Sequence, residues 1–229
     1  MNTKVKTIRR TSHLISTDEF PDVAFEVSFE PADLYEETIF FSKLPDNKVL
    51  VGYLSHDDCA QDPLESCDGS GNIYSAHRSS RSHAEMQDAL GLDSDWEPNL
   101  DSIGTPYAIS LDVYDHGGQV YSISGTGTQC QWDTARGGAV WVPDECCLAH
   151  IMTQPESERK AMAYKCCESA LVEFNAWLSG DTYGVCISTC DAITGKELES
   201  EECWGFYTAK YALEEVKNTI EYSTKKEST

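Results

Sequence analysis

Basic side chains are scarce in this chain. It contains 17 Lys and Arg against 39 Asp and Glu, which gives a formal net charge of −22. The first ten residues hold four of the basic side chains and no acid, so residues 11–229 carry 39 acidic and 13 basic side chains, a net charge of −26. Nucleic acids and anionic membrane surfaces are bound through Lys and Arg. The shortage therefore argues against direct binding to either, and the excess of acid creates a strong negative field.

Long apolar runs are also missing. No stretch of eighteen consecutive apolar residues occurs, whereas a membrane-spanning helix needs about 20. The first residues are basic but polar, and they lack the apolar core of a secretory signal. Because 40% of the residues are hydrophobic and 10% are aromatic, the composition is typical of a folded globule. We expect a cytoplasmic protein that does not contact a membrane.

Cysteine is not scarce, but its spacing is unusual for a metal site. Zinc ligands usually occur as C-x2-4-C pairs, and of the ten cysteines only Cys186 and Cys190 show such a spacing. Cys146-Cys147 and Cys166-Cys167 are adjacent in sequence. We expect reduced and mostly buried thiols, with a zinc site as the alternative, and no bound metal or cofactor.

The hydrophobic pattern predicts an α+β fold built mainly on an antiparallel sheet. Residues 23–29 alternate apolar and acidic residues, as in a half-buried strand. Apolar residues at helical spacing predict one long helix over 156–179, ended by Gly180, and a C-terminal helix follows at about 209–222. Further strands are expected at 38–42, 49–54, 107–114, 119–124, 139–142 and 182–190.

Composition also predicts how the chain is divided. We expect a basic flexible arm at 1–17, a single domain over 18–222, and a frayed tail at 223–229. Within the domain, residues of about 55–103 are rich in acids, Ser, Gly and Pro, with one short helix predicted at roughly 82–90. We interpret this stretch as an acidic, loop-rich insertion, because long irregular segments are usually functional or mobile.

Five short blocks combine residues that seldom occur together by chance. They are His56-Asp57-Asp58 with Asp62-Pro63-Leu64-Glu65 and Asp68-Gly69, Tyr114-Asp115-His116-Gly117, Cys130-Gln131-Trp132-Asp133, Gly180-Asp181-Thr182-Tyr183-Gly184, and Cys203-Trp204-Gly205-Phe206-Tyr207. In order and approximate spacing they resemble the D…NPRE…DN-G, YDHSG, C-x-WD, GDVYG and CWGFYG blocks of an uncharacterised family of small proteins from phages and other mobile elements. The resemblance covers roughly residues 53–80 and 107–210.

This sequence departs from the family pattern at three places. The family's Pro-Arg is Pro63-Leu64 here, Gly118 follows Gly117 where a Ser-Gly pair is usual, and Thr208 stands in place of the last Gly. The resemblance implies a compact fold and an origin in a mobile element. It implies no established chemistry.

The acidic residues are the candidate partner-binding surface. They are Asp57, Asp58, Asp62, Glu65, Asp68, Asp93, Asp95, Glu97, Glu199, Glu201 and Glu202. The block from Asp57 to Asp68 offers oxygen ligands for Ca²⁺ or Mg²⁺, although it does not match an EF-hand loop. The alternatives are a solvated loop stabilised by Asx turns and a surface that imitates phosphate.

Other motifs point only weakly to catalysis. His116 lies in an expected hairpin turn, where a titrating imidazole would need a partner. His83-Ala84-Glu85 matches the first half of the zinc-deaminase signature, but the second half requires two cysteines separated by two residues, and Cys146-Cys147 are adjacent. The tryptophans would stack on bases only beside a basic groove, so we expect them to pack in the core.

Three functions remain open at this point. The favoured one is a non-enzymatic phage or mobile-element accessory protein in the host cell cytoplasm, which binds and inhibits a host defence or DNA-processing protein by acidic nucleic-acid mimicry. The second is a metal-dependent enzyme that uses His56, Asp57, Asp58, His116 and Asp133. The third is an acidic scaffold or regulatory protein whose charge serves solubility or salt adaptation.

Overall fold

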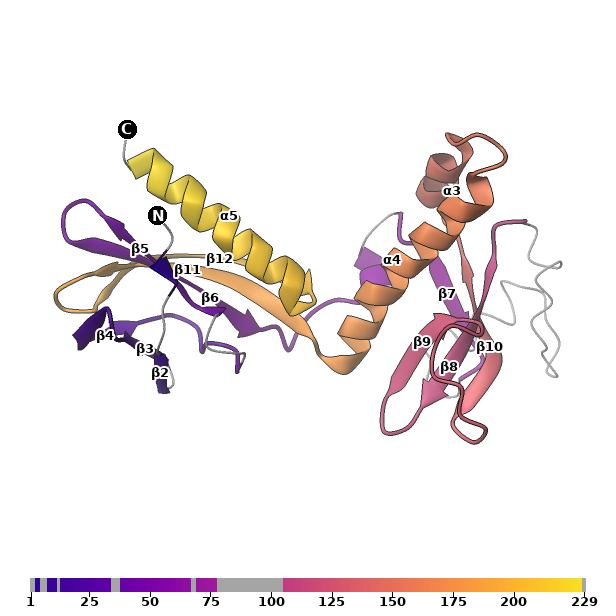
Figure 1. The fold of residues 1–229 in the computed structure, drawn as a ribbon, viewed down its shortest axis with the longest axis horizontal. Helices are drawn as coiled ribbons and strands as arrows, with labels where there is room; N and C mark the ends of the chain where they lie inside the picture. The colour runs from indigo at the N-terminus through magenta and orange to yellow at the C-terminus, as the bar shows by residue number, and fades with distance from the viewer. Residues whose placement is uncertain are drawn as a thin grey trace. The chain divides into compact units, whose positions relative to one another are not determined.

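The chain forms an α+β structure, as its sequence predicts, and it folds as two compact units (Figure 1). The computed structural model describes residues 3–4, 8–11, 13–33, 38–66, 69–77 and 105–227. Unit 1 comprises Met1–Ala60 and Gly180–Thr229, and unit 2 comprises Gln61–Ser179. This division differs from the single domain expected over 18–222. Its physical cause is that each unit buries its own apolar cores.

Unit 1 contains eight strands and one helix in its described part. Five strands form one antiparallel sheet in the order β1-β5-β6-β11-β12, and the other three form a second sheet in the order β2-β3-β4. Their bounds are β1 Thr3–Lys4, β2 Ile8–Thr11, β3 Leu14–Thr17, β4 Phe20–Glu26, β5 Phe40–Leu44, β6 Lys48–His56, β11 Thr182–Asp191, β12 Glu197–Tyr207 and α5 Ala209–Glu227.

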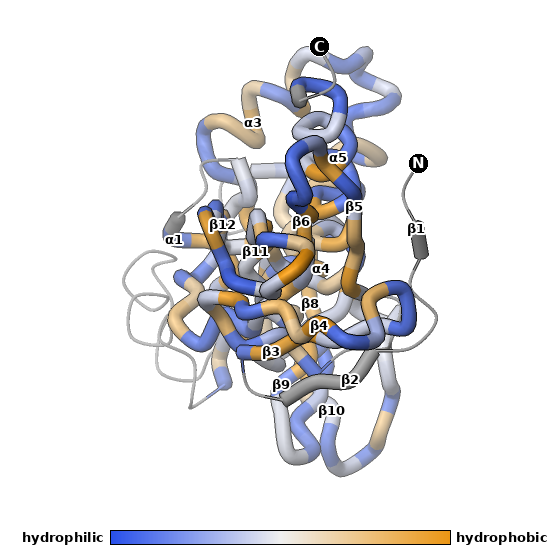
Figure 2. Tube along the Cα trace, turned by 90° about the vertical axis from the view of Figure 1, so that its left-hand side faces the viewer, coloured by the Kyte–Doolittle hydropathy of each residue, from blue (hydrophilic) through white to orange (hydrophobic). Residues whose placement is uncertain are grey.

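The five-stranded sheet of unit 1 is covered on both faces. On one face β3 and β4 contribute Ile15 and Phe25 to a core with Val51. On the other face α5 contributes Val216 and Ile220 to a core with residues of β6 and β11. Strand β6 is therefore a nearly continuous apolar run rather than an alternating one (Figure 2).

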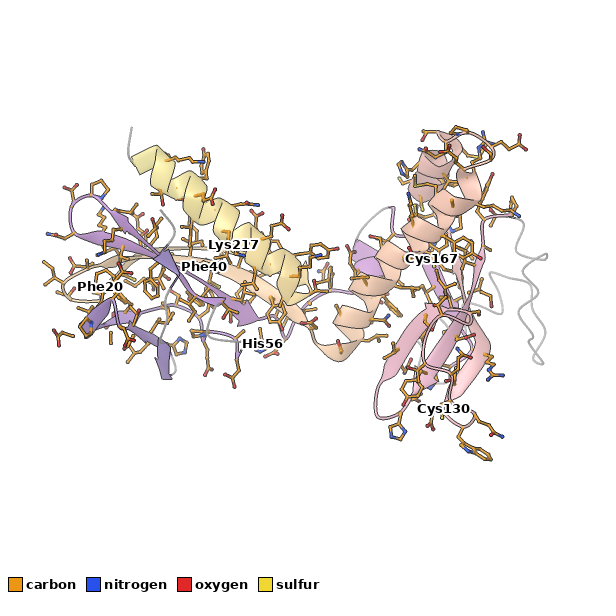
Figure 3. All side chains as sticks on the ribbon, in the orientation of Figure 1. Phe20, Phe40, His56, Cys130, Cys167 and Lys217 are labelled. Carbon is orange, nitrogen blue, oxygen red and sulfur yellow. The ribbon has the colours of Figure 1, made fainter. Side chains whose placement is uncertain are left out.

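Helix α5 lies close to the sheet at one glycine. A Cβ atom at Gly52 would collide with the Ile220 side chain, so the absence of a side chain there allows the close approach. One turn earlier in the helix, the Lys217 ammonium lies 5.5 Å from the centroid of the Phe40 ring (Figure 3). These contacts fix the helix over β5 and β6.

Unit 2 packs two helices against one face of a four-stranded antiparallel sheet. The strand order is β7-β10-β8-β9, and Trp141, fully buried, packs in the same core as Ile151 of α3 and Phe174 of α4. The bounds are α1 Pro63–Ser66, β7 Asn72–Ser75, β8 Ile109–Asp115, β9 Gln119–Ile123, β10 Thr134–Val142, α3 Glu145–Met152 and α4 Arg159–Ser179. Helix α4 begins three residues later than expected, and Gly180 follows it with a φ of +73°.

The ends of the chain are more regular than the composition predicts. Residues 14–17, expected in a flexible arm, form strand β3, because Ile15 is 0% exposed and packs beside Phe25. Helix α5 continues through most of the expected tail, and the Thr224 hydroxyl lies 2.9 Å from the Ser42 hydroxyl. The described part of the expected insertion contains α1 and β7, whereas the helix expected at 82–90 lies outside the described residues. No helix in the described ranges is long and apolar enough to cross a membrane.

The connection between β12 and α5 shows backbone strain at Thr208. Thr208 connects β12 to α5 with a φ of +72°, in the left-handed region that favours glycine. Its backbone N–H donates to the Asp181 carbonyl at 2.9 Å. Its hydroxyl is buried and has no hydrogen-bond partner among the described residues.

Thr208→Gly is therefore expected to stabilise the protein. The substitution removes a left-handed threonine and a buried hydroxyl, and we expect the free energy of unfolding to rise by about 1 kcal/mol in urea denaturation followed by circular dichroism. The matched control is Thr219→Gly inside α5, which should lower it by a few tenths of a kcal/mol, about 0.3 to 0.5. Destabilisation by Thr208→Gly would contradict the strain at this connection.

Candidate functional site

Three of the family-like blocks meet in unit 1. Tyr183, in the fourth block, pairs with His56 of β6 on one side and with Phe206 of β12 on the other. The Asp57 carboxylate accepts hydrogen bonds from the backbone N–H groups of Cys59 (3.1 Å) and Gly205 (3.2 Å). His56-Asp57-Asp58 of the first block therefore meets the fourth and fifth blocks at the end of β6, while the rest of the first block belongs to unit 2.

The residues where these blocks meet in unit 1 are closely packed. Trp204 lies over Gly184, where a Cβ atom would collide with the indole ring, and its centroid is 5.1 Å from that of Phe29. Gly205 has a φ of +87° at an irregularity in the β11–β12 register. The Asp57 carboxylate is already hydrogen-bonded to this backbone. The contact between these blocks is therefore explained by the fold alone and needs no ligand.

The remaining two blocks meet in unit 2. The Asp115 N–H donates to the Asp133 carbonyl at 2.8 Å. The Asp133 carboxylate lies 3.3 Å from Nδ1 of His116 and accepts from the Cys130 thiol at 3.2 Å. Between these residues, Trp132 is 86% exposed, which contradicts its expected place in the core. The turn at His116 thus has the partner that the sequence could not assign.

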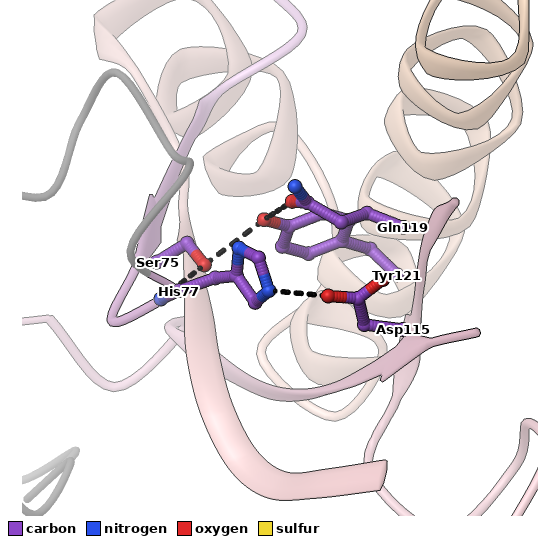
Figure 4. Close-up of polar contacts among 5 residues, drawn as sticks. All are labelled: Ser75, His77, Asp115, Gln119 and Tyr121. Carbon is purple, nitrogen blue, oxygen red and sulfur yellow. Dashed lines mark hydrogen bonds and ion pairs between the residues drawn. The ribbon is translucent and has the colours of Figure 1, made fainter. Parts of the chain in front are cut away.

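A second imidazole is held beside the same turn (Figure 4). His77 Nε2 lies 2.8 Å from the Asp115 carboxylate, and the backbone N–H of His77 donates to the Ser75 hydroxyl. The Tyr121 hydroxyl is 2.9 Å from Ser75 Oγ and 3.0 Å from Gln119 Oε1. Serine, histidine and aspartate are the residues of a catalytic triad, but Ser75 is 1% exposed, so its hydroxyl is not accessible to an external substrate.

Asp112 is a buried carboxylate that the sequence does not single out. It accepts four hydrogen bonds of 2.8 Å, from the N–H groups of Gly125 and Gly137 and from the side chains of Ser124 and Gln129. Burial acts to raise its pKa, but these four donors outweigh burial and hold the pKa below its ordinary value. The sequence gives no signal for it, because Asp112 occupies a polar position in the alternating pattern of β8, as Ser110 does. Asp112 thereby holds the segment that carries Cys130–Asp133.

The cysteines of the described part are free thiols, nine in number. Burial raises the pKa of four of them to about 12, which keeps them protonated and unreactive at neutral pH: Cys147, Cys167, Cys186 and Cys190. Among the described residues no group of three or more His, Cys, Asp and Glu is arranged to hold a metal ion. His83 and Glu85 lie outside these residues.

The candidate acidic residues do not form one segment. Asp68, Asp93, Asp95 and Glu97 lie outside the described residues. Asp62 and Glu65 belong to unit 2, where the Asp62 carboxylate accepts from the Leu64 N–H at 2.9 Å at the start of α1. The others belong to unit 1: Asp57, Asp58, Glu199, Glu201 and Glu202.

Glu199, Glu201 and Glu202 lie on β12, at the edge of the five-stranded sheet. In the register with β11, Glu199 and Glu201 lie on the face covered by α5, and Glu202 lies on the opposite face. All three are exposed, and none forms an ion pair or a side-chain hydrogen bond with another described residue. Unlike Asp57, they are free to contact a partner.

Glu197, in the same strand, is bound within unit 1. Its carboxylate accepts from the Ser188 hydroxyl and from the N–H and hydroxyl of Ser28. It therefore joins β11, β12 and the residues after β4. No pattern in the sequence separates this glutamate from its three neighbours, because Ser28 is 169 residues away along the chain.

Comparison with known proteins gives no relative: no family model, no curated protein and no solved structure matches this chain.

Asp112→Asn is expected to destabilise unit 2. The NH₂ group of the asparagine would face hydrogen-bond donors that now meet a carboxylate oxygen. We expect the free energy of unfolding to fall by about 3 kcal/mol at pH 7, measured by urea denaturation. Because the pKa of Asp112 is lowered on folding, its contribution is complete above the unfolded pKa of about 4 and is lost as the pH falls through the lower folded value. The difference between wild type and variant should therefore shrink below about pH 4. The exposed Glu156→Gln is the control, and an equal loss in both would contradict this role.

Proposed function

We propose that this chain is a phage or mobile-element accessory protein that binds a basic host protein and blocks the surface with which that protein holds nucleic acid. The observation that carries the proposal is the group of three exposed carboxylates on β12, Glu199, Glu201 and Glu202, which form no ion pair with the described residues. A target that recognises phosphates offers the Lys and Arg that these carboxylates lack.

The spacing of the carboxylates supports the imitation of a phosphate chain. Residues of an antiparallel strand rise by about 3.4 Å each, so Glu199 to Glu202 extends over about 10 Å and carries three charges. One strand of DNA carries a charge about every 3.4 Å along its axis. Counted along the strand, the β12 charges are thus about one per 5 Å, the same order of density, with Glu199 and Glu201 on one face of the sheet and Glu202 on the other.

The overall charge supports fast recognition of such a target. A chain with a net charge of −22 attracts a basic protein over the Debye length, which is about 8 Å at physiological salt. Association driven in this way is fast and weakens as salt is added. The target class is a nuclease, a restriction enzyme or a nucleoprotein defence effector in the host cytoplasm.

The metal-dependent enzyme has less support among the described residues. It would use Asp57, whose carboxylate is hydrogen-bonded to two backbone N–H groups, together with His116, whose described partner is Asp133. A scaffold with charge for solubility explains the composition equally well. In such a scaffold the three glutamates would serve only to prevent β12 from pairing with another copy, so the experiment compares their position with charge placed elsewhere.

Neutralising Glu199, Glu201 and Glu202 together is expected to weaken binding to the target. Wild type is used to capture its target from host lysate at low salt, and displacement of labelled duplex DNA from the captured protein is then measured. Glu199→Gln, Glu201→Gln and Glu202→Gln combined should weaken binding by about tenfold or more.

The matched control changes three exposed glutamates of unit 2, Glu156, Glu158 and Glu168, to Gln. It alters the net charge by the same amount and should bind like wild type. An equal loss of binding in both triple variants would show that the overall negative charge, and not its position on β12, drives binding. Binding that does not compete with DNA would contradict the proposal.

A further inference from the structure

The outer edge of β12 is long and unpartnered. The strand has eleven residues, stands last in its sheet, and pairs only with β11 within the described part of the chain. Eight consecutive residues, 198–205, are exposed. A sheet edge presents a row of backbone N–H and C=O groups that a further strand can pair with. Proteins often protect such edges with Pro, charged side chains or β-bulges; β12 contains no Pro, but it carries four glutamates and its register with β11 has two irregularities.

The charge of the strand selects what can pair with it. A second copy of β12 would place glutamates opposite glutamates, and like charges directly opposite one another destabilise a strand pair. Helix α5 covers one face of the sheet but does not supply a strand at this edge. The occupant that complements the edge is therefore an extended segment rich in Lys or Arg, not another copy of this chain.

The side chains of β12 also indicate a pattern for that segment. Glu199 and Glu201 share one face with Cys203, while Glu202 shares the opposite face with Trp204, which is 39% exposed. Residues paired across strands lie on the same face. Basic residues at alternate positions would meet Glu199 and Glu201, and an apolar residue three positions beyond the one that meets Glu201 would lie opposite Trp204.

From this edge and its charges, we propose that the partner adds a basic extended segment to β12 as a sixth strand of the sheet. Main-chain hydrogen bonds to the edge then provide affinity, and the alternating glutamates provide specificity. This inference rests on the proposed function and adds the mode of binding. It requires that the target carry a flexible or edge-forming basic segment rather than only a basic surface.

The test uses a synthetic octapeptide of four Lys-Val repeats, which matches the eight exposed residues in length. A second version is N-methylated at every residue, so that it keeps the charge and loses the backbone donors. Strand addition predicts binding of the first peptide at low salt and a loss of about tenfold or more for the second. Hydrogen exchange of the amides in 198–205 should slow only with the first.

Several results would overturn the inference. Equal affinity of the two peptides would show attraction by charge alone, as would the absence of amide protection. Failure of the first peptide to bind would also overturn it. Self-association of the Glu199→Gln, Glu201→Gln, Glu202→Gln variant with unchanged peptide affinity would mean that the carboxylates only prevent edge pairing. The proposed function is decided separately, by DNA displacement from the captured target, and survives each of these results.

Discussion

The pairing of β6 with β11 is the constraint on which the rest of unit 1 depends. The two strands run antiparallel from Tyr183 opposite His56 to Asp191 opposite Lys48, and all of unit 2 lies between them in the sequence. Both faces of this pair are covered, by β3 and β4 on one side and by α5 on the other. Once its centre is enclosed in this way, the sheet has only its edges to offer to a partner. Strand β12 is one of those edges, and it is where the exposed carboxylates lie.

Local features of the fold could be predicted from sequence because their causes are local. The end of α4 follows from Gly180, whose left-handed conformation is inexpensive for glycine. In contrast, the pairing of β6 with β11 joins segments more than a hundred residues apart, and no periodicity specifies such a partner. The buried position of Ile15 was missed for the same reason, since its neighbour Phe25 belongs to another strand.

The candidate site shows the same limit. Composition identifies Asp57 and Glu199 as members of one acidic set, but the structure gives them different roles. Asp57 is hydrogen-bonded to Gly205, which is 148 residues away, whereas Glu199 has no such partner among the described residues. Counting charges in the sequence does not reveal this difference. A carboxylate that accepts hydrogen bonds from the backbone and one that faces solvent are both written as Asp or Glu. Only the hydrogen bonds that Asp57 accepts from Cys59 and Gly205 in the folded chain separate them.

Acidity and edge position have separate physical effects, and β12 combines them. Carboxylates on a covered strand would cost desolvation energy, and carboxylates on a mobile loop would lose entropy on binding a partner. On an edge strand the backbone is already ordered by β11, so the charges are held at a fixed spacing without that cost. The same charges oppose pairing with a second copy of the strand. An edge of this kind can pair with a basic segment but disfavours pairing with a second copy of itself. A long unpaired strand can therefore exist in the fold without causing self-association.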